Sequence, residues 1–251
     1  MFVDGGIAVP PLVVFDNVTY AIGGRTILDR LNLEIEPGAA LVLLGRSGSG
    51  KTTALKLVNG LIAPTSGQVL VQGIATNAWD PIRLKRGIGY VIQETGLFPH
   101  FTIGENVGLV PRLEGWTPER IAARTRELLL HMGLEPEEFE RRYPRQLSGG
   151  QRQRVGVARA LAVNPALLLF DEPFGALDPI TRLDLQEQFL ALQRTMQTTA
   201  IFVTHDVREA LRLGTRIALL DAGRLAVVAT PEEFVKQTGA EARAFLECLR
   251  F

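Results

Sequence analysis

The chain has 251 residues with 27 basic and 27 acidic side chains, and this zero net charge removes the general electrostatic argument for a nucleic-acid-binding protein. Its 46% hydrophobic and 22% charged residues are typical of a globular protein and exclude a disordered one. Cys248 is the only cysteine, so no disulfide can form within the chain, which fits a reducing compartment.

The first residues, 1–6, contain no basic segment, so we expect no signal peptide. No run approaches the roughly 18 apolar residues that a membrane-spanning helix needs. Any role at a membrane is therefore expected to come through a partner.

The first 93 residues predict an α/β organisation. Short apolar runs separated by turn residues are typical of strands. Apolar residues at helical spacing after a glycine-rich loop predict a helix. The expected strands are Leu12–Phe15, Ile27–Ile35, Leu41–Leu44, Gln68–Val71 and Ile88–Ile92, and the expected helix is Thr52–Leu61.

Helical patterns dominate the middle of the chain, over Thr102–Leu109, Pro118–Met132 and Gly149–Val163. Thr117 and Ser148 are favourable N-cap residues for the second and third of these helices. Arginines are frequent between positions 141 and 154, but four glutamates at positions 135–140 precede them. This balance favours a solvated surface over a nucleic-acid-binding patch.

Strands and helices alternate again after Pro165. The expected strands are Ala166–Phe170, Thr199–Val203 and Arg216–Leu220, and the expected helices are Pro179–Gln197 with Asp178 as cap, Val207–Leu213, Pro231–Gln237 and Glu241–Leu249. The organisation is thus α/β, then a helical insert, then α/β.

A glycine-rich loop at 45–52 fits the pattern G-x-x-x-x-G-K-[ST] between an expected strand and an expected helix. Such a loop points successive N–H groups at phosphate oxygens, and the new helix adds its positive end. Lys51 would reach the β- and γ-phosphates, and the Thr52 hydroxyl would bind Mg²⁺. The predicted nucleotide-binding residues are Gly45, Arg46, Ser47, Gly48, Ser49, Gly50, Lys51, Thr52 and Thr53.

A second pattern places two carboxylates, Asp171 and Glu172, at the end of an apolar strand. Ligands of α/β sheets bind at this strand edge. Asp171 would hold Mg²⁺, and Glu172 would orient and deprotonate an attacking water. The alternative is an acidic turn without function, but the phosphate loop favours the functional interpretation.

A third pattern opens the expected helix at 149 with a serine cap and two glycines, where backbone N–H groups and a hydroxyl would take a second phosphate. The alternative is an ordinary capped helix. The sequence Leu147–Gln151 resembles the signature of ATP-binding-cassette ATPases, the energy-coupling subunits of ABC transporters. The residues concerned are Ser148, Gly149, Gly150 and Gln151.

The resemblance extends from about Leu12 to about Glu233, with its motifs in the family's order. It implies that Gln93 touches Mg²⁺ or the water, that His205 contacts the γ-phosphate, and that Asp178 ends the loop following the two carboxylates. The family's usual adenine-stacking aromatic falls at Ile22. Tyr20, expected on the same strand face, is the candidate replacement.

The implied fold is a P-loop NTPase (RecA-like) α/β core with an N-terminal antiparallel β subdomain and an inserted α-helical signature subdomain. Residues 1–251 would form one ATPase domain, with the core at about 10–93 and 165–230, the helical subdomain at about 94–164 and a tail at about 231–251. The resemblance also implies ATP and Mg²⁺ as cofactors and a head-to-tail homodimer. Lys51 of one chain and Ser148, Gly149 and Gly150 of the other would enclose each ATP.

The sequences at 91–107 and 171–182 resemble those of bacterial importers of glycine betaine, choline, carnitine or proline betaine. The implied partners are transmembrane permease subunits and a periplasmic or lipid-anchored solute-binding protein, without nucleic acid, at the cytoplasmic face of the inner membrane. Importers of amino acids, sulfonates or inorganic anions share the catalytic motifs, and a non-transport cassette is a third alternative. Because the sequence stops at Phe251, we expect no C-terminal regulatory domains.

The segment Leu97–Phe101, which follows Gln93, is apolar for a connecting loop. It fits either a groove for a partner helix or the core of the helical insert.

Overall fold

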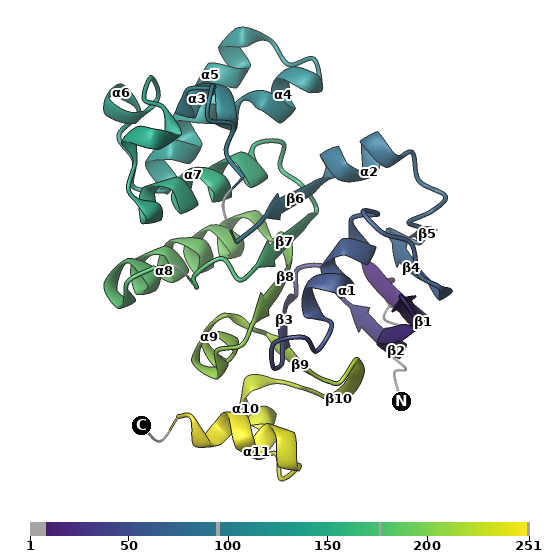
Figure 1. The fold of residues 1–251 in the computed structure, drawn as a ribbon. Helices are drawn as coiled ribbons and strands as arrows, with labels where there is room; N and C mark the ends of the chain where they lie inside the picture. Colours follow the sequence, from purple (N-terminus) through teal and green to yellow (C-terminus); the bar gives the residue numbers. More distant parts are fainter. Residues whose placement is uncertain (1–8, 94–95, 176, 250–251) are drawn as a thin grey trace, which may run out of the picture.

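The computed structural model describes residues 9–93, 96–175 and 177–249, which form two sheets with helices around them (Figure 1). The first sheet is antiparallel, in the order β2-β1-β4-β5. Its strands are β1 (Val13–Ile22), β2 (Arg25–Ile35), β4 (Ser66–Val71) and β5 (Ile74–Ala75). Gly23 and Gly24 join β1 to β2 with φ of 58° and 75°, which is the conformation that a tight hairpin requires.

The second sheet has the order β10-β9-β3-β8-β7-β6. Its strands are β3 (Ala40–Leu44), β6 (Ile88–Val91), β7 (Leu167–Asp171), β8 (Thr199–Thr204), β9 (Arg216–Asp221) and β10 (Arg224–Ala229). All neighbours pair in parallel except β9 and β10, which form an antiparallel hairpin. The carboxyl ends of β3, β8, β7 and β6 therefore meet at one edge.

The parallel strands are apolar on both faces because both faces are covered. Val42 and Leu44 of β3 belong to one core cluster, and Leu41 and Leu43 belong to the other. The first cluster contains an aromatic group in which the Phe170 ring stacks on Phe202 at 4.5 Å and meets Phe189 edge-on at 4.9 Å. The sheet therefore holds its carboxyl edge rigidly between two packed layers.

Helices cover the sheet and fill the chain between β6 and β7. Around the sheet lie α1 (Lys51–Val58), α2 (Pro81–Gly87), α8 (Pro179–Met196), α9 (Val207–Leu213), α10 (Pro231–Phe234) and α11 (Ala240–Glu247). Between β6 and β7 lie α3 (Ile103–Val107), α4 (Leu109–Leu113), α5 (Pro118–His131), α6 (Pro136–Phe139), the 3₁₀ turn η1 (Pro144–Gln146) and α7 (Gly149–Leu161). Figure 1 shows this second group as a separate layer beyond β6.

The predicted caps Thr117, Ser148 and Asp178 each accept a hydrogen bond from the first turn of the helix that follows. The predicted helix at 102–109 instead divides into α3 and α4 at Gly108. The helix predicted to reach Leu61 ends at Val58, because the chain turns through Gly60 at φ 63°. The sequence analysis did not predict β5, α2 and α6, because each of these elements is too short to show a clear hydrophobic periodicity.

Arginines of the helical layer are largely engaged with neighbouring groups. Arg142 pairs with Glu138 at 2.7 Å, and Arg126 lies 3.2 Å from Glu137. Arg154 donates to the Met132 carbonyl at 2.9 Å. These contacts agree with the predicted solvated, charge-balanced surface. Within the described ranges, no helix has both the length and the apolar character needed to cross a bilayer.

Candidate functional site

Four of the predicted motifs follow neighbouring strands of the parallel sheet. The phosphate loop follows β3, His205 follows β8, Glu172 follows β7, and Gln93 lies two residues beyond β6. Since these strands lie side by side in the order β3-β8-β7-β6, the sheet gathers the four motifs along its carboxyl edge.

The phosphate loop packs tightly at its ends and is open at its middle. A Cβ added to Gly45 would lie 2.5 Å from the Leu220 carbonyl oxygen, and one added to Gly50, at φ 101°, would lie 2.6 Å from Leu28 Cδ2. Gly48, at φ 80°, has open space around it. Glycine is therefore required at Gly45 and Gly50, where the loop packs against neighbouring strands, and at Gly48, where the backbone has a positive φ.

Lys51 lies inside this loop and is 5% exposed. Its Nζ donates to the carbonyl oxygens of Gly45 at 2.8 Å and Arg46 at 2.9 Å. Burial lowers the pKa of Lys51, while the charges of Glu172 and Asp171 oppose that effect. An anion bound in the loop would favour the charged ammonium.

Thr52 and Asp171 meet below the loop, where Thr52 Oγ1 donates to Asp171 Oδ1 at 2.8 Å. Burial raises the pKa of Asp171, and the hydrogen bond from Thr52 counteracts this in part. Burial is the main reason why the pKa of Tyr90 is raised, and the charge of the neighbouring Asp171 raises it further. Sequence reasoning missed Tyr90, which reaches Asp171 only because β6 pairs with β7.

Glu172 has a left-handed backbone, with φ of 47°. Its N–H donates to the Val203 carbonyl at 3.1 Å, and its Oε2 lies 3.4 Å from His205 Nδ1. A non-glycine residue in this region costs about 1–2 kcal/mol, and such residues cluster at functional sites. The carboxylate that follows this strained turn thus lies beside His205, the residue predicted to contact the γ-phosphate.

The residues present fit a nucleoside triphosphate with Mg²⁺. Ser49 Oγ is buried in the loop and has no hydrogen-bond partner in the described part of the chain, as expected of a donor that awaits a phosphate oxygen. No cluster of three or more His, Cys, Asp or Glu in the described ranges could hold a metal. A threonine hydroxyl and one carboxylate suit Mg²⁺, which takes its other ligands from phosphate and water.

The second predicted phosphate site lies away from the first within one chain. Figure 1 places α7 in the helical layer and α1 beside the two sheets. Ser148 and Gly149 are exposed at the start of α7, and Ser148 Oγ accepts from the Gln151 N–H at 3.2 Å. A Cβ on Gly150 would lie 2.6 Å from Thr181 Cγ2, so this glycine is also required where α7 packs on α8.

Three predicted residues occupy the margin of the site. Gln93 is exposed. Arg46 of the phosphate loop pairs with Glu241 of α11 at 3.1 Å. Asp178 accepts from the Thr181 N–H at 3.0 Å, and its hydrogen bonds with Thr181 lower its pKa. Of the predicted loops, residues 94, 95 and 176 lie outside the described residues.

Tyr20 and Ile22 differ in their surroundings. The register of β1 against β2 shifts between Tyr20 and Ala21, but the extra residue lies on β2, so the alternation of β1 from Tyr20 to Ile22 is not interrupted. Tyr20 packs against the core, whereas Ile22 is 62% exposed. Contact of Tyr20 with a base remains a prediction.

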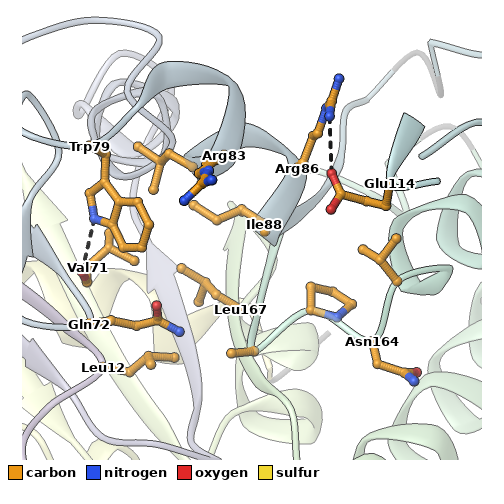
Figure 2. Close-up of a pocket in the computed structure, with 15 residues that line it drawn as sticks. Leu12, Val71, Gln72, Trp79, Arg83, Arg86, Ile88, Glu114, Asn164 and Leu167 are labelled. Carbon is orange, nitrogen blue, oxygen red and sulfur yellow. Dashed lines mark hydrogen bonds and ion pairs between the residues drawn. The ribbon is translucent and has the colours of Figure 1, made fainter. Parts of the chain in front are cut away.

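A pocket of about 490 Å³ lies at the opposite edge of the sheet. Figure 2 shows that Trp79, Ile88 and Leu167 line it, at the amino ends of β6 and β7. None of the predicted site residues lines this pocket. The chemistry of the carboxyl edge is therefore separate from it.

Comparisons with known proteins agree with this geometry. Residues 28–175 match the ABC transporter family. Over 219 residues the chain is 50% identical to the glycine betaine/carnitine/choline transport ATP-binding protein OpuCA of Bacillus subtilis, covering 87% of this chain and 57% of that protein. Over 214 residues it is 50% identical to the osmoprotectant import ATP-binding protein OsmV of Salmonella typhimurium, covering 85% and 56%. The chain thus spans little more than half the length of these relatives.

A solved structure carries the same fold. The dimeric ATP-binding cassette MJ0796, in a post-hydrolysis state bound to ADP and Pi, superposes with a TM-score of 0.78 at 37% identity, covering 87% of this chain and 98% of that one. This likeness confirms the predicted P-loop NTPase core with its β subdomain and helical insert. The chain therefore belongs to the ABC transporter family and has the fold of its ATP-binding cassettes.

Proposed function

We propose that this chain hydrolyses ATP and couples the hydrolysis to import of a small solute. The observation that carries the proposal is the cluster at the carboxyl edge of the sheet. There a buried lysine lies in a phosphate loop, and the Thr52–Asp171 and Glu172–His205 pairs lie at 2.8 and 3.4 Å. Each pair combines groups that phosphoryl transfer to water requires.

The roles follow from the chemistry of each group. Lys51 and the loop N–H groups hold the phosphates, while Thr52 and Asp171, with Gln93, hold Mg²⁺. The bound Mg²⁺ supplies positive charge to the phosphate oxygens. Glu172 orients the attacking water and accepts its proton, and His205 positions Glu172 and contacts the terminal phosphate.

The signature residues act on the ATP of a second copy. Ser148, Gly149 and Gly150 lie at the start of α7, in the helical layer, whereas Lys51 opens α1 beside the two sheets (Figure 1). The start of α7 is exposed and offers N–H groups. A head-to-tail homodimer would bring each signature to the partner's phosphate loop. Binding of ATP then favours the closed dimer, and hydrolysis releases it.

The cargo we propose is a quaternary amine such as glycine betaine, choline or carnitine, supported by the names of the two relatives. The partners would be permease subunits and a periplasmic or lipid-anchored solute-binding protein, with this chain peripheral at the cytoplasmic face of the membrane. Phe98, five residues after Gln93 in the sequence, is 46% exposed and would contact the permease, whereas Leu97 packs against the core.

Hydrolysis is tested with the purified chain and its Glu172→Gln variant. The wild type should hydrolyse ATP only with Mg²⁺. Glu172→Gln should bind ATP as well as the wild type does but turn over on the order of 100-fold more slowly, because the general base is lost. Glu232→Gln, at an exposed position of α10, is the matched control. Failure of the wild type to hydrolyse ATP would contradict the function, and full turnover in Glu172→Gln would remove Glu172 as the base.

The cargo is tested by uptake of radiolabelled glycine betaine in a strain lacking this chain. Restoration by the wild type but not by Lys51→Ala is the expected result. If the strain lacking this chain took up betaine normally but had lost uptake of sulfate, sulfonates or amino acids, the result would favour the alternative importer class.

A further inference from the structure

Arg182, in the first turn of α8, joins two segments of the site that are far apart in sequence. Its Nη2 donates to the Leu177 carbonyl at 3.3 Å, next to Asp178. Its Nη1 lies 3.6 Å from Asp206 Oδ2, and its Nε lies 4.0 Å from Glu209 Oε1. One guanidinium thus contacts the turn before α8 and the segment that carries His205.

The groups on the His205 side form a connected network. Glu209, which is 6% exposed, accepts from Thr204 Oγ1 at 2.6 Å. Thr204 Oγ1 in turn accepts from the Asp206 N–H at 3.0 Å. Because Thr204 and Asp206 precede and follow His205 directly, this network fixes the backbone on both sides of the imidazole.

Arg182 supplies the positive charge that this network needs. Burial raises the pKa of Glu209, and the Asp206 charge raises it further, while Thr204, Arg182 and His205 oppose the rise. The Nε of Arg182 is buried with no hydrogen-bond partner in the part of the chain that the structure describes, and it faces the Glu209 carboxylate. Without Arg182, the carboxylates of Asp206 and Glu209 would lose the guanidinium charge that faces them.

We propose that Arg182 is a positioning residue: it holds the His205 segment against the turn at Leu177, so that the imidazole stays next to Glu172. The expected change in turnover rests on the proposed ATP hydrolysis, but the expected position of the His205 imidazole does not. A charged group that acts through another residue should change turnover more than nucleotide binding.

The kinetic test uses Arg182→Gln and Arg182→Lys. We expect Arg182→Gln to lower kcat by on the order of 10- to 100-fold with little change in KM for ATP, because a displaced catalytic group slows chemistry. Arg182→Lys should recover part of the loss, since it keeps the charge. The matched control is Arg212→Gln, which removes another arginine bridge between α9 and α8, to Glu187 at 2.8 Å, and should leave kcat unchanged. A wild-type kcat in Arg182→Gln, or an equal loss in Arg212→Gln, would overturn the proposal.

A second readout does not depend on hydrolysis. The chain has 3 histidines, His100, His131 and His205, whose imidazole NMR signals can be assigned by substitution. Arg182→Gln should move the His205 signals and leave those of His100 and His131 in place, whereas general unfolding would move all of them. Unmoved His205 signals would overturn the proposal whatever the rates. If the wild type hydrolysed no ATP, the proposed function would fail and this measurement alone would decide the role of Arg182.

Discussion

Lys51 and Asp171 carry opposite charges, and burial penalises the charged form of both. Glu172 adds backbone strain, since its φ of 47° is costly for a residue with a side chain. These features oppose folding and are tolerated because packed strands surround them. A bound phosphate and metal would offset the burial penalty on the charges of Lys51 and Asp171.

Asp171→Asn should stabilise the chain at neutral pH. The folded state raises the pKa of Asp171, so it binds this proton more tightly than the unfolded state does. Stability is then lost as the pH rises from the ordinary carboxyl pKa of about 4 through the folded value. Asparagine avoids this loss and keeps an acceptor for Thr52. Urea unfolding between pH 4 and 8 should show an advantage for Asp171→Asn that grows with pH. An advantage that stays constant or shrinks would contradict the buried, ionised carboxylate.

At the scale of elements, motifs at strand ends were predictable and contacts across strands were not. The phosphate loop, Asp171 and Glu172 were predicted because each lies at the end of an apolar run, and His205 was predicted from its place in the family's order of motifs. Tyr90 and Arg182 were missed because their roles depend on which strand or helix lies beside them.

Gly89→Ala tests how closely β6 and α7 approach each other. An added Cβ would lie 2.4 Å from the Ala160 carbonyl oxygen and 2.5 Å from Leu168 Cδ2, and a backbone oxygen cannot yield cheaply. We expect a loss of about 1–3 kcal/mol in the free energy of unfolding. Gly87 lies two residues earlier, and a Cβ added there would meet open space. Gly87→Ala should therefore change the free energy of unfolding by no more than about 0.5 kcal/mol. Equal denaturation midpoints for the two variants would show that β6 and α7 are not packed so closely.

At the scale of the whole molecule, the fold separates two groups of residues that we propose bind phosphate. The sheet edge assembles Lys51, Asp171, Glu172 and His205 in one chain, while α7 presents Ser148 elsewhere (Figure 1). The sequence motifs identify both groups. They do not show that the two groups lie apart, because that depends on the position of the helical layer. Their separation is the reason for proposing a site shared by two copies.

Ser148→Arg should spare ATP binding by a single chain and lower hydrolysis by on the order of 100-fold, because the donors offered to the partner's phosphates are blocked. Ser148 also caps α7, so thermal unfolding should show a loss of about 1 kcal/mol. Asn77→Arg, at an exposed position, is the matched control. Full hydrolysis by Ser148→Arg would exclude the signature from the reaction.

Crosslinking between two differently tagged chains tests the shared site most directly. Both chains carry Glu172→Gln to retain ATP and Cys248→Ser to remove the native thiol; one has Ser47→Cys in the phosphate loop and the other Ser148→Cys at the start of α7. With a short thiol-reactive crosslinker, the account predicts a product containing both tags that forms with ATP and not without it. ATP-saturated chains that yield no such product would contradict the account.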